Sequence, residues 1–111
     1  IREWIHVEDH IDGLLHLSKY GKVGESYCIG SGEEYSNNDI VKTICKIYDE
    51  LNGRKDSEKL ISFVEDRKGH DYRYALNSSK IIKSGWNCKM NFKDSMKNTI
   101  TWYLKNKSFL D

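Results

Sequence analysis

Proline is absent from this sequence of 111 residues, and cysteine occurs only three times. Average proteins contain about 5% proline, but lysine and asparagine are so common here that we attribute the absence to codon bias and not to the fold. Cys28, Cys45 and Cys88 lie far apart and form no Cys-x-x-Cys pair. Their number and spacing argue against a disulfide framework and favour a reducing, cytoplasmic environment.

The sequence also lacks a long apolar run and a strong net charge. No segment approaches the roughly 18 apolar residues of a membrane span, and no charged-then-apolar leader is present. The formal net charge of +1 gives no general attraction to nucleic acid or to an anionic membrane, so we expect neither as a partner. Any anion must therefore be bound through local placement of Arg and Lys.

Length and composition predict one domain over residues 1–111. With 38% apolar residues, either the core is thin or the chain is one layer of a larger structure. Because the chain begins at Ile1 and not at Met, directly within a strand-like pattern, we expect it to be a fragment or a processed piece of a longer product.

Apolar and polar residues alternate over residues 1–7, which is the period of a half-buried strand. A helix is expected next, with Asp9 as its N-cap and Gly21 as a left-handed C-cap. One face of this helix carries Ile11, Leu14, Leu15 and Ser18. Residues 25–29 predict a second short strand that is buried on both faces.

A second helix is predicted to begin with the capping-box pattern of Ser36 and Asp39, or with Asn37 as its cap, and to end at Gly53. The remaining predicted elements are strands over residues 60–65 and 72–76, a short helix that ends at Gly85-Trp86, and a last helix that starts near Asn91. This order predicts a small mixed α/β domain with short strands and four helices.

Two groups of residues allow both a functional and a structural interpretation. His6 and His10 stand four residues apart, but Glu8 between them does not occupy the position that zinc-protease patterns require. We therefore predict no metal site. Asn37 stands at a helix start behind a Gly-rich turn, where it can cap the helix or help to hold an anion or a sugar hydroxyl.

The strongest functional signal is the polar loop over residues 66–71. Arg67 can donate paired hydrogen bonds to phosphate oxygens, Gly69 permits close approach of the backbone, and His70 adds a donor near neutral pH. Asp66 would repel a phosphate, so its expected partner is a hydroxyl group or a neighbouring cation. The residues alone leave open whether this loop is a binding site or a polar turn between strands.

Several segments resemble the dTDP-glucose 4,6-dehydratases, which belong to the extended short-chain dehydrogenases/reductases. Residues 2–10, Arg-Glu-Trp-Ile-His-Val-Glu-Asp-His, are similar to the family's Arg-Asp-Trp-x-x-Val-Glu-Asp-His segment, and residues 24–30 to its Gly-Glu-x-Tyr-Asn-Ile-Gly strand. Residues 63–74 contain Asp-Arg-Lys-Gly-His-Asp and resemble its Val-x-Asp-Arg-Pro-Gly-His-Asp-x-Arg-Tyr signature. Gly85-Trp86 and residues 101–104 continue the match, so the resemblance spans nearly the whole chain.

The resemblance implies that the chain is the carboxy-terminal substrate-binding domain of such an enzyme. In the family, an amino-terminal Rossmann domain binds NAD through a glycine fingerprint and carries a Tyr-x-x-x-Lys pair together with an Asp-Glu acid/base pair. We expect none of these groups in this chain, so that it has no catalytic, cofactor-binding or metal-binding residues and is inactive alone.

The family reaction converts dTDP-glucose to dTDP-4-keto-6-deoxyglucose. It oxidises C4 of the glucose by hydride transfer to NAD, eliminates water across C5 and C6, and returns the hydride to C6. The substrate contacts implied by position are Arg2, Asn37, Asp66, Arg67, Gly69 and His70. The full-length protein is expected to be a homodimer.

The sequence departs from the family pattern at several positions. Lys68 replaces the family proline, so we expect the loop to be more mobile before substrate binds. Glu3 for Asp, Cys28 for Asn and Ser31 for Gly leave the base and sugar preference open. Two alternatives therefore stand beside the dTDP-glucose dehydratase: the same domain of a UDP-sugar dehydratase or epimerase, and a non-catalytic module that binds nucleotide sugars.

Overall fold

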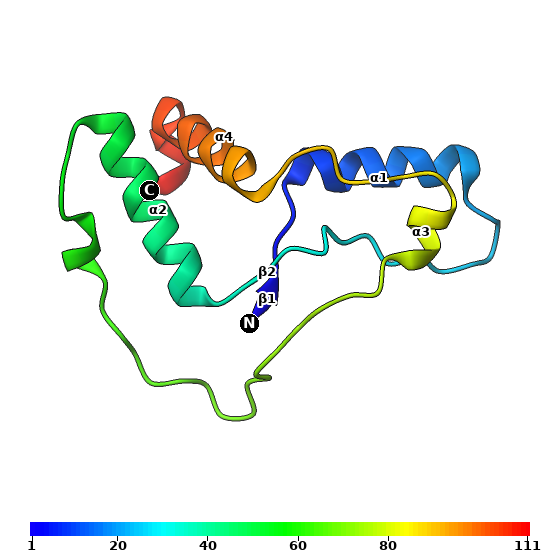
Figure 1. The fold of residues 1–111 in the computed structure, drawn as a ribbon, viewed down its shortest axis with the longest axis horizontal. Helices are drawn as coiled ribbons and strands as arrows, with labels where there is room; N and C mark the ends of the chain where they lie inside the picture. The colour runs from blue at the N-terminus through cyan, green and yellow to red at the C-terminus, as the bar shows by residue number, and fades with distance from the viewer.

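A computed structural model describes residues 1–111 and places a two-stranded antiparallel sheet between two groups of helices (Figure 1). In the sheet, β1 (Arg2–Glu3) pairs with β2 (Glu34–Tyr35), with Arg2 opposite Tyr35. The helical elements are α1 (Val7–Tyr20), α2 (Asn37–Asn52), α3 (Ser79–Lys83), α4 (Phe92–Lys105) and the 3₁₀ turns η1 (Ser57–Leu60) and η2 (Lys107–Leu110). The predicted mixed α/β domain with four helices is therefore confirmed.

The boundaries of α2 and α4 follow from local signals in the sequence. Ser36 Oγ accepts a hydrogen bond from the Asp39 backbone nitrogen at 3.1 Å, and the Asp39 carboxylate accepts one from the Ser36 nitrogen at 3.3 Å. Loss of such a cap costs about 0.5–2 kcal/mol. The helix ends at Gly53, whose left-handed φ of 61° favours glycine. Asn91 caps α4 with its side-chain oxygen, which accepts a hydrogen bond from the Asp94 backbone nitrogen at 2.9 Å, so the expected starts of both helices are confirmed.

Helix α1 begins earlier than the sequence predicts. Its N-cap is His6 and not Asp9, because the His6 ring nitrogen Nδ1 accepts a hydrogen bond from the Glu8 backbone nitrogen at 3.1 Å. The helix ends at Gly21 as expected, but Gly21 has an extended conformation (φ −71°, ψ 148°) and not the predicted left-handed one.

Asp9 does not cap α1 because its carboxylate makes a tertiary contact instead. Its side chain is buried and accepts hydrogen bonds from the backbone nitrogens of Lys89 and Met90, both at 3.2 Å. One turn further on, Asp12 accepts a hydrogen bond from the Trp86 indole nitrogen at 3.0 Å. The hydrogen bonds from Trp86 and Lys89 lower the pKa of the Asp12 carboxyl group. Together these two acids attach α1 to the connection between α3 and α4.

Three of the predicted strands do not form. Residues 25–29 and 61–65 belong to no strand, Leu60 lies in η1, and Tyr74 makes only an isolated parallel bridge to Arg2. A strand needs a neighbour that takes up its backbone hydrogen bonds. In this structure β1 and β2 pair with each other over only two residues each, so the other extended segments have no ladder to join.

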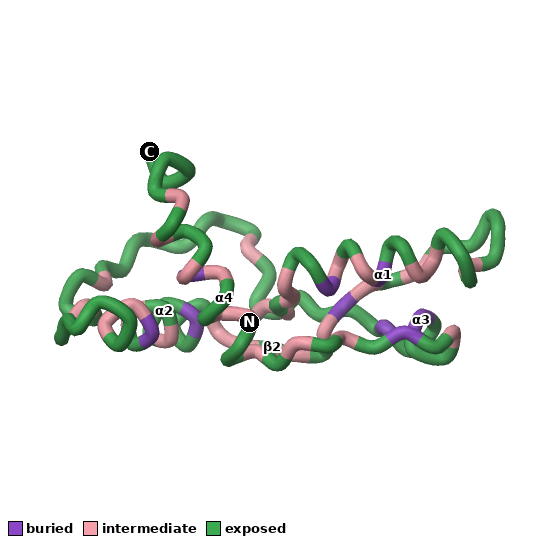
Figure 2. The backbone as a smooth tube through the Cα atoms, turned by 90° about the horizontal axis from the view of Figure 1, so that it is seen from above, coloured by how far each residue is buried: buried purple, intermediate pink, exposed green.

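The core is thin and divided (Figure 2), since only 9 of the 111 residues are buried. One cluster joins α2 and α4 through Ile40, Ile47 and Ile100, and a second surrounds Ile81 and Trp86 beside α1. The thin core that the composition allowed is therefore present.

The apolar face of α1 remains largely exposed. Val7, Ile11, Leu14 and Leu15 are between 49% and 65% exposed, although their spacing predicts a face that packs on a core. No helix in the chain has both the length and the apolar composition that crossing a lipid bilayer requires.

We predict that the protein self-associates through this α1 face, because an exposed apolar patch of this kind favours association. Light scattering over a wide concentration range should show the mass rising with concentration, and Leu15→Lys should reduce that rise. Glu8→Lys, which reverses a charge at a polar position of the same helix, should change the rise less. A wild-type protein that stays monomeric throughout would contradict the prediction.

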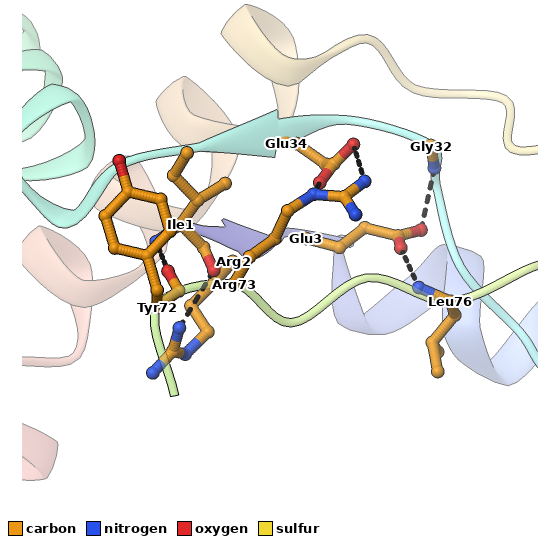
Figure 3. A network of polar contacts seen from close by, with 8 residues as sticks. All are labelled: Ile1, Arg2, Glu3, Gly32, Glu34, Tyr72, Arg73 and Leu76. Atoms are coloured by element: carbon orange, nitrogen blue, oxygen red, sulfur yellow. Dashed lines mark hydrogen bonds and ion pairs between the residues drawn. The ribbon is translucent and has the colours of Figure 1, made fainter. Parts of the chain in front are cut away.

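Glu3 joins three segments that are distant in the sequence (Figure 3). One carboxylate oxygen accepts a hydrogen bond from the Gly32 nitrogen and the other accepts one from the Leu76 nitrogen, both at 2.8 Å. We name this contact the Glu3 bridge. A Cβ atom at Gly30 would overlap the Glu3 carboxylate and lie 2.9 Å from Ser78 Oγ, so the bridge requires glycine at position 30.

Gly30→Ala should lower the free energy of unfolding by about 1–3 kcal/mol, the usual cost of overpacking. Urea denaturation measures this loss. In a Glu3→Ala background the further loss from Gly30→Ala should be smaller, because the main overlap is gone. Equal losses in both backgrounds would mean that the Glu3 carboxylate does not restrict position 30.

Candidate ligand-binding site

An open cleft of about 1050 Å³ lies beside the start of α2. Its other walls come from residues 58–66, residues 70–72 and the beginning of the chain at Ile1 and Arg2. We name it the α2 cleft. A smaller pocket of about 300 Å³ adjoins it and is lined by Arg2, residues 67–71 and Tyr74. Arg2, His70 and Asp71 line both spaces.

The structure brings the six expected contact residues to these two spaces. Arg2, Asn37, Asp66 and His70 line the α2 cleft, and Arg67 and Gly69 line the adjoining pocket. They come from β1, from the first turn of α2 and from the polar loop, three segments far apart in the sequence.

Backbone hydrogen bonds place Arg2 beside the loop. The Tyr74 nitrogen donates to the Ile1 oxygen at 2.9 Å, and the Glu3 nitrogen donates to the Tyr74 oxygen at 3.1 Å. The Ile1 nitrogen donates to the Tyr72 oxygen at 2.7 Å (Figure 3). The chain after the loop therefore runs alongside β1 and holds the loop against the Arg2 side chain.

The Arg2 guanidinium group is fixed by three contacts. Its Nη1 donates to the Ile1 oxygen at 2.8 Å, its Nη2 contacts the His70 ring nitrogen Nε2, and its central carbon lies 4.7 Å from the centre of the Tyr74 ring. The last contact is a cation–π interaction. The remaining N–H groups of Arg2 have no partner within the protein, so they are available to an anion.

His70 is held from its other side by the loop itself. Its Nδ1 lies 3.8 Å from a carboxylate oxygen of Asp66, whose side chain is otherwise exposed. Close by, the Asp71 carboxylate raises the pKa of the Tyr74 hydroxyl group. The two acids of the loop thus lie next to His70 and Tyr74, and no carboxylate pairs with Arg67.

Asn37 does not cap α2, because Ser36 takes that role. The side chain of Asn37 is exposed, makes no hydrogen bond within the protein and lines the α2 cleft. Of its two sequence interpretations, capping is therefore wrong, and the amide is available to a ligand.

The loop contains a tight turn over residues 67–70. The His70 nitrogen donates to the Arg67 oxygen at 3.2 Å, and Gly69 has a φ of 74°. A turn with a positive φ at its third residue favours glycine there and commonly carries proline at its second residue. The second residue here is Lys68, and its backbone nitrogen makes no hydrogen bond within the protein.

Sequence reasoning missed the aromatic and charged residues around these contacts. Phe63 and Tyr72 line the α2 cleft and are highly exposed, and Lys42 and Glu58 face them from α2 and η1. Tyr74, which packs on Arg2, was likewise not assigned. The available signal was the aromatic residues that flank the polar loop on both sides.

An apolar cavity of about 620 Å³ lies between α2 and α4 and is the main alternative location for a ligand. It includes Trp4, Ile44, Met96 and other apolar residues, and no Lys or Arg lines it. A phosphate-bearing ligand therefore fits the α2 cleft better.

The glycine pair Gly30 and Gly32 does not form a dinucleotide-binding site. The turn at Gly30-Ser31-Gly32 is occupied by the Glu3 carboxylate, which accepts the Gly32 N–H that a phosphate would need. This turn does not fit NAD.

One sequence expectation needs correction, because Tyr103 and Lys107 do have the Tyr-x-x-x-Lys spacing. Helix α4 ends at Lys105 and Lys107 lies in η2, so the pair does not share one helix. The Tyr103 ring packs edge-on against Trp102, and neither residue lines the α2 cleft.

Comparison with known proteins gives a consistent result. Residues 1–99 match the family model described as GDP-mannose 4,6 dehydratase. The chain is 45% identical over 115 residues to a dTDP-glucose 4,6-dehydratase of Escherichia coli, covering 98% of this chain and 32% of that protein. It is 43% identical to the dTDP-glucose 4,6-dehydratase of Neisseria meningitidis serogroup B, with the same coverage.

A solved structure resembles the fold as well. The crystal structure of dTDP-glucose 4,6-dehydratase from Bacillus anthracis in complex with NAD superposes with a TM-score of 0.81 at 34% sequence identity. The match covers 96% of this chain and 32% of that one. The chain thus spans about a third of the length of the relatives it matches.

Lys68→Pro should raise the free energy of unfolding by about 0.4–1 kcal/mol, because proline restricts the unfolded chain and no hydrogen bond is lost. Gly69→Ala, at the next position, should instead lower it by about 1 kcal/mol, since alanine is strained at a positive φ. Urea denaturation of both variants measures these changes. A Lys68→Pro variant less stable than the wild type would contradict the assigned turn.

Proposed function

The chain belongs to the family described as GDP-mannose 4,6 dehydratase, and on that basis we propose that it is the nucleotide-sugar-binding domain of a dTDP-glucose 4,6-dehydratase. The domain comprises residues 1–111 and binds the nucleotide diphosphate, while the catalytic groups and NAD belong to a Rossmann domain of the same polypeptide. The limited share of the relatives' length that the chain spans supports this division of labour.

The observation that carries the proposal is the meeting of Arg2, Asn37 and the polar loop at the α2 cleft. Arg67 makes no side-chain contact within the protein and lines the pocket next to Arg2, so both guanidinium groups can bind one diphosphate. Gly69 lets the backbone approach the ligand, and His70 lies between Arg2 and Asp66.

One carboxylate group and one amide group complete the site. The Asp66 carboxylate is almost fully exposed at the cleft, where it suits a sugar or ribose hydroxyl and not a phosphate. The Asn37 amide can donate to and accept from such hydroxyls. The six residues Arg2, Asn37, Asp66, Arg67, Gly69 and His70 therefore supply both cationic and hydroxyl-binding groups.

In the complete enzyme this domain contributes positioning and not chemistry. Binding the nucleotide and diphosphate fixes the glucose relative to NAD and the catalytic residues of the Rossmann domain, which is how remote binding energy supports a reaction. The chain alone is accordingly inactive. The complete protein is a cytoplasmic homodimer, and the three free cysteines fit a reducing compartment.

A competition experiment can decide which nucleotide base the site prefers. The matching family model is named for a GDP-sugar, whereas the relatives are named for dTDP-glucose. We expect dTDP-glucose to bind more tightly than UDP-glucose or GDP-glucose when the three compete in calorimetry. Tighter binding of UDP-glucose would favour the UDP-sugar alternative.

Arg67→Ala should weaken dTDP-glucose binding by about 1.5–3 kcal/mol, the value of a charge-assisted hydrogen bond, and should leave the fold intact. Isothermal calorimetry gives the affinity, and circular dichroism the fold. Arg54→Ala is the matched control, because Arg54 is exposed and lies outside the α2 cleft and the adjoining pocket.

The control variant should bind as the wild type does. An unchanged affinity in Arg67→Ala, with dTDP-glucose still bound, would remove Arg67 from the site. Absence of dTDP-glucose binding in the wild-type protein would remove the proposed function itself.

A further inference from the structure

The contact between Arg2 and His70 constrains the proton on the His70 ring. An arginine side chain has only donors, so the His70 nitrogen Nε2 that meets Arg2 Nη2 must be the acceptor. This contact therefore fits the tautomer that carries its proton on Nδ1. That nitrogen faces the Asp66 carboxylate at 3.8 Å, which favours a proton on this side.

We propose that His70 is a positioning residue: its ring nitrogen Nε2 holds Arg2 against Tyr74, and Arg2, not His70, meets the diphosphate of the ligand. This inference rests on the proposed function and specifies how one residue of that site works. His70 is only 23% exposed at its side chain, whereas Arg67 and Asp66 next to it in the loop are exposed. The ring is thus turned toward Arg2 more than toward the open cleft.

The benefit of this arrangement is preorganisation. A free arginine side chain must lose much rotamer freedom when it binds an anion. Here the Ile1 oxygen, the Tyr74 ring and His70 fix the guanidinium group before a ligand arrives. The affinity of the site should therefore depend on an acceptor at the position of His70 Nε2, and not on a positive charge there.

Two substitutions separate the acceptor from the ring. His70→Gln can place an amide oxygen near the position of Nε2, whereas His70→Asn can reach only the position of Nδ1. We expect His70→Asn to lose affinity roughly tenfold, and His70→Gln to recover most of that loss. Equal losses in both variants would overturn the proposal.

A double-mutant cycle with Arg2 tests whether His70 acts through it. Once Arg2→Ala has removed the guanidinium group, adding His70→Asn should change affinity by less than about twofold. Additive losses would show that His70 contacts the ligand independently. Thermal denaturation of each variant identifies any that lose affinity by unfolding.

A ligand-free measurement keeps this inference separate from the proposed function. Long-range ¹H–¹⁵N correlation spectra of the His70 ring at pH 7.5 should show a protonated Nδ1 and an unprotonated Nε2, and Arg2→Ala should abolish this fixed tautomer. A protonated Nε2 in the wild type would overturn the positioning role of His70 even if dTDP-glucose binds. The expected tautomer without any dTDP-glucose binding would support the positioning role and remove the proposed function.

Discussion

The Glu3 bridge is the contact on which the arrangement of the chain depends. One carboxylate accepts hydrogen bonds from Gly32 and Leu76 and so ties the segment before β2 and the segment before α3 to β1. Pairing of the strands contributes little to stability, since β1 and β2 form only two residue pairs. A charge-assisted bond to a backbone nitrogen contributes more than a neutral one, so a single side chain can substitute for a longer ladder.

The thin core explains why polar contacts carry so much of the structure. The α2–α4 cluster and the Ile81–Trp86 cluster are separate, and the elongated molecule (Figure 1) joins them through β1 and through Asp9 and Asp12 on α1. Apolar burial in two small clusters gives limited stability to each. The connections between them must therefore come from directed hydrogen bonds, which require particular residues at particular positions.

Features encoded within a few residues could be predicted from the sequence, and features that need a distant partner could not. The Ser36–Asp39 capping box, the helix end at Gly53 and the helix start near Asn91 are local, and all were found where their patterns predicted them. The left-handed conformation predicted for Gly21 was the local exception. Asp9 looks like a cap in the sequence, but the backbone of Lys89 and Met90 takes its carboxylate. In the same way, alternation can predict an extended segment such as residues 25–29 but cannot provide its ladder partner.

The candidate site combines both kinds of information. The residue types of the loop were readable from the sequence, but the meeting of the loop with Arg2 depends on the hydrogen bonds between Tyr74 and the residues on either side of Arg2. The same strand β1 carries the Glu3 bridge. A ligand that bridges Arg2 and the loop binds only the assembled arrangement, so it must stabilise that arrangement by mass action. Binding and folding of this half of the chain would therefore be coupled through β1, in which Glu3, the anchor of the fold, directly follows Arg2, the proposed ligand contact.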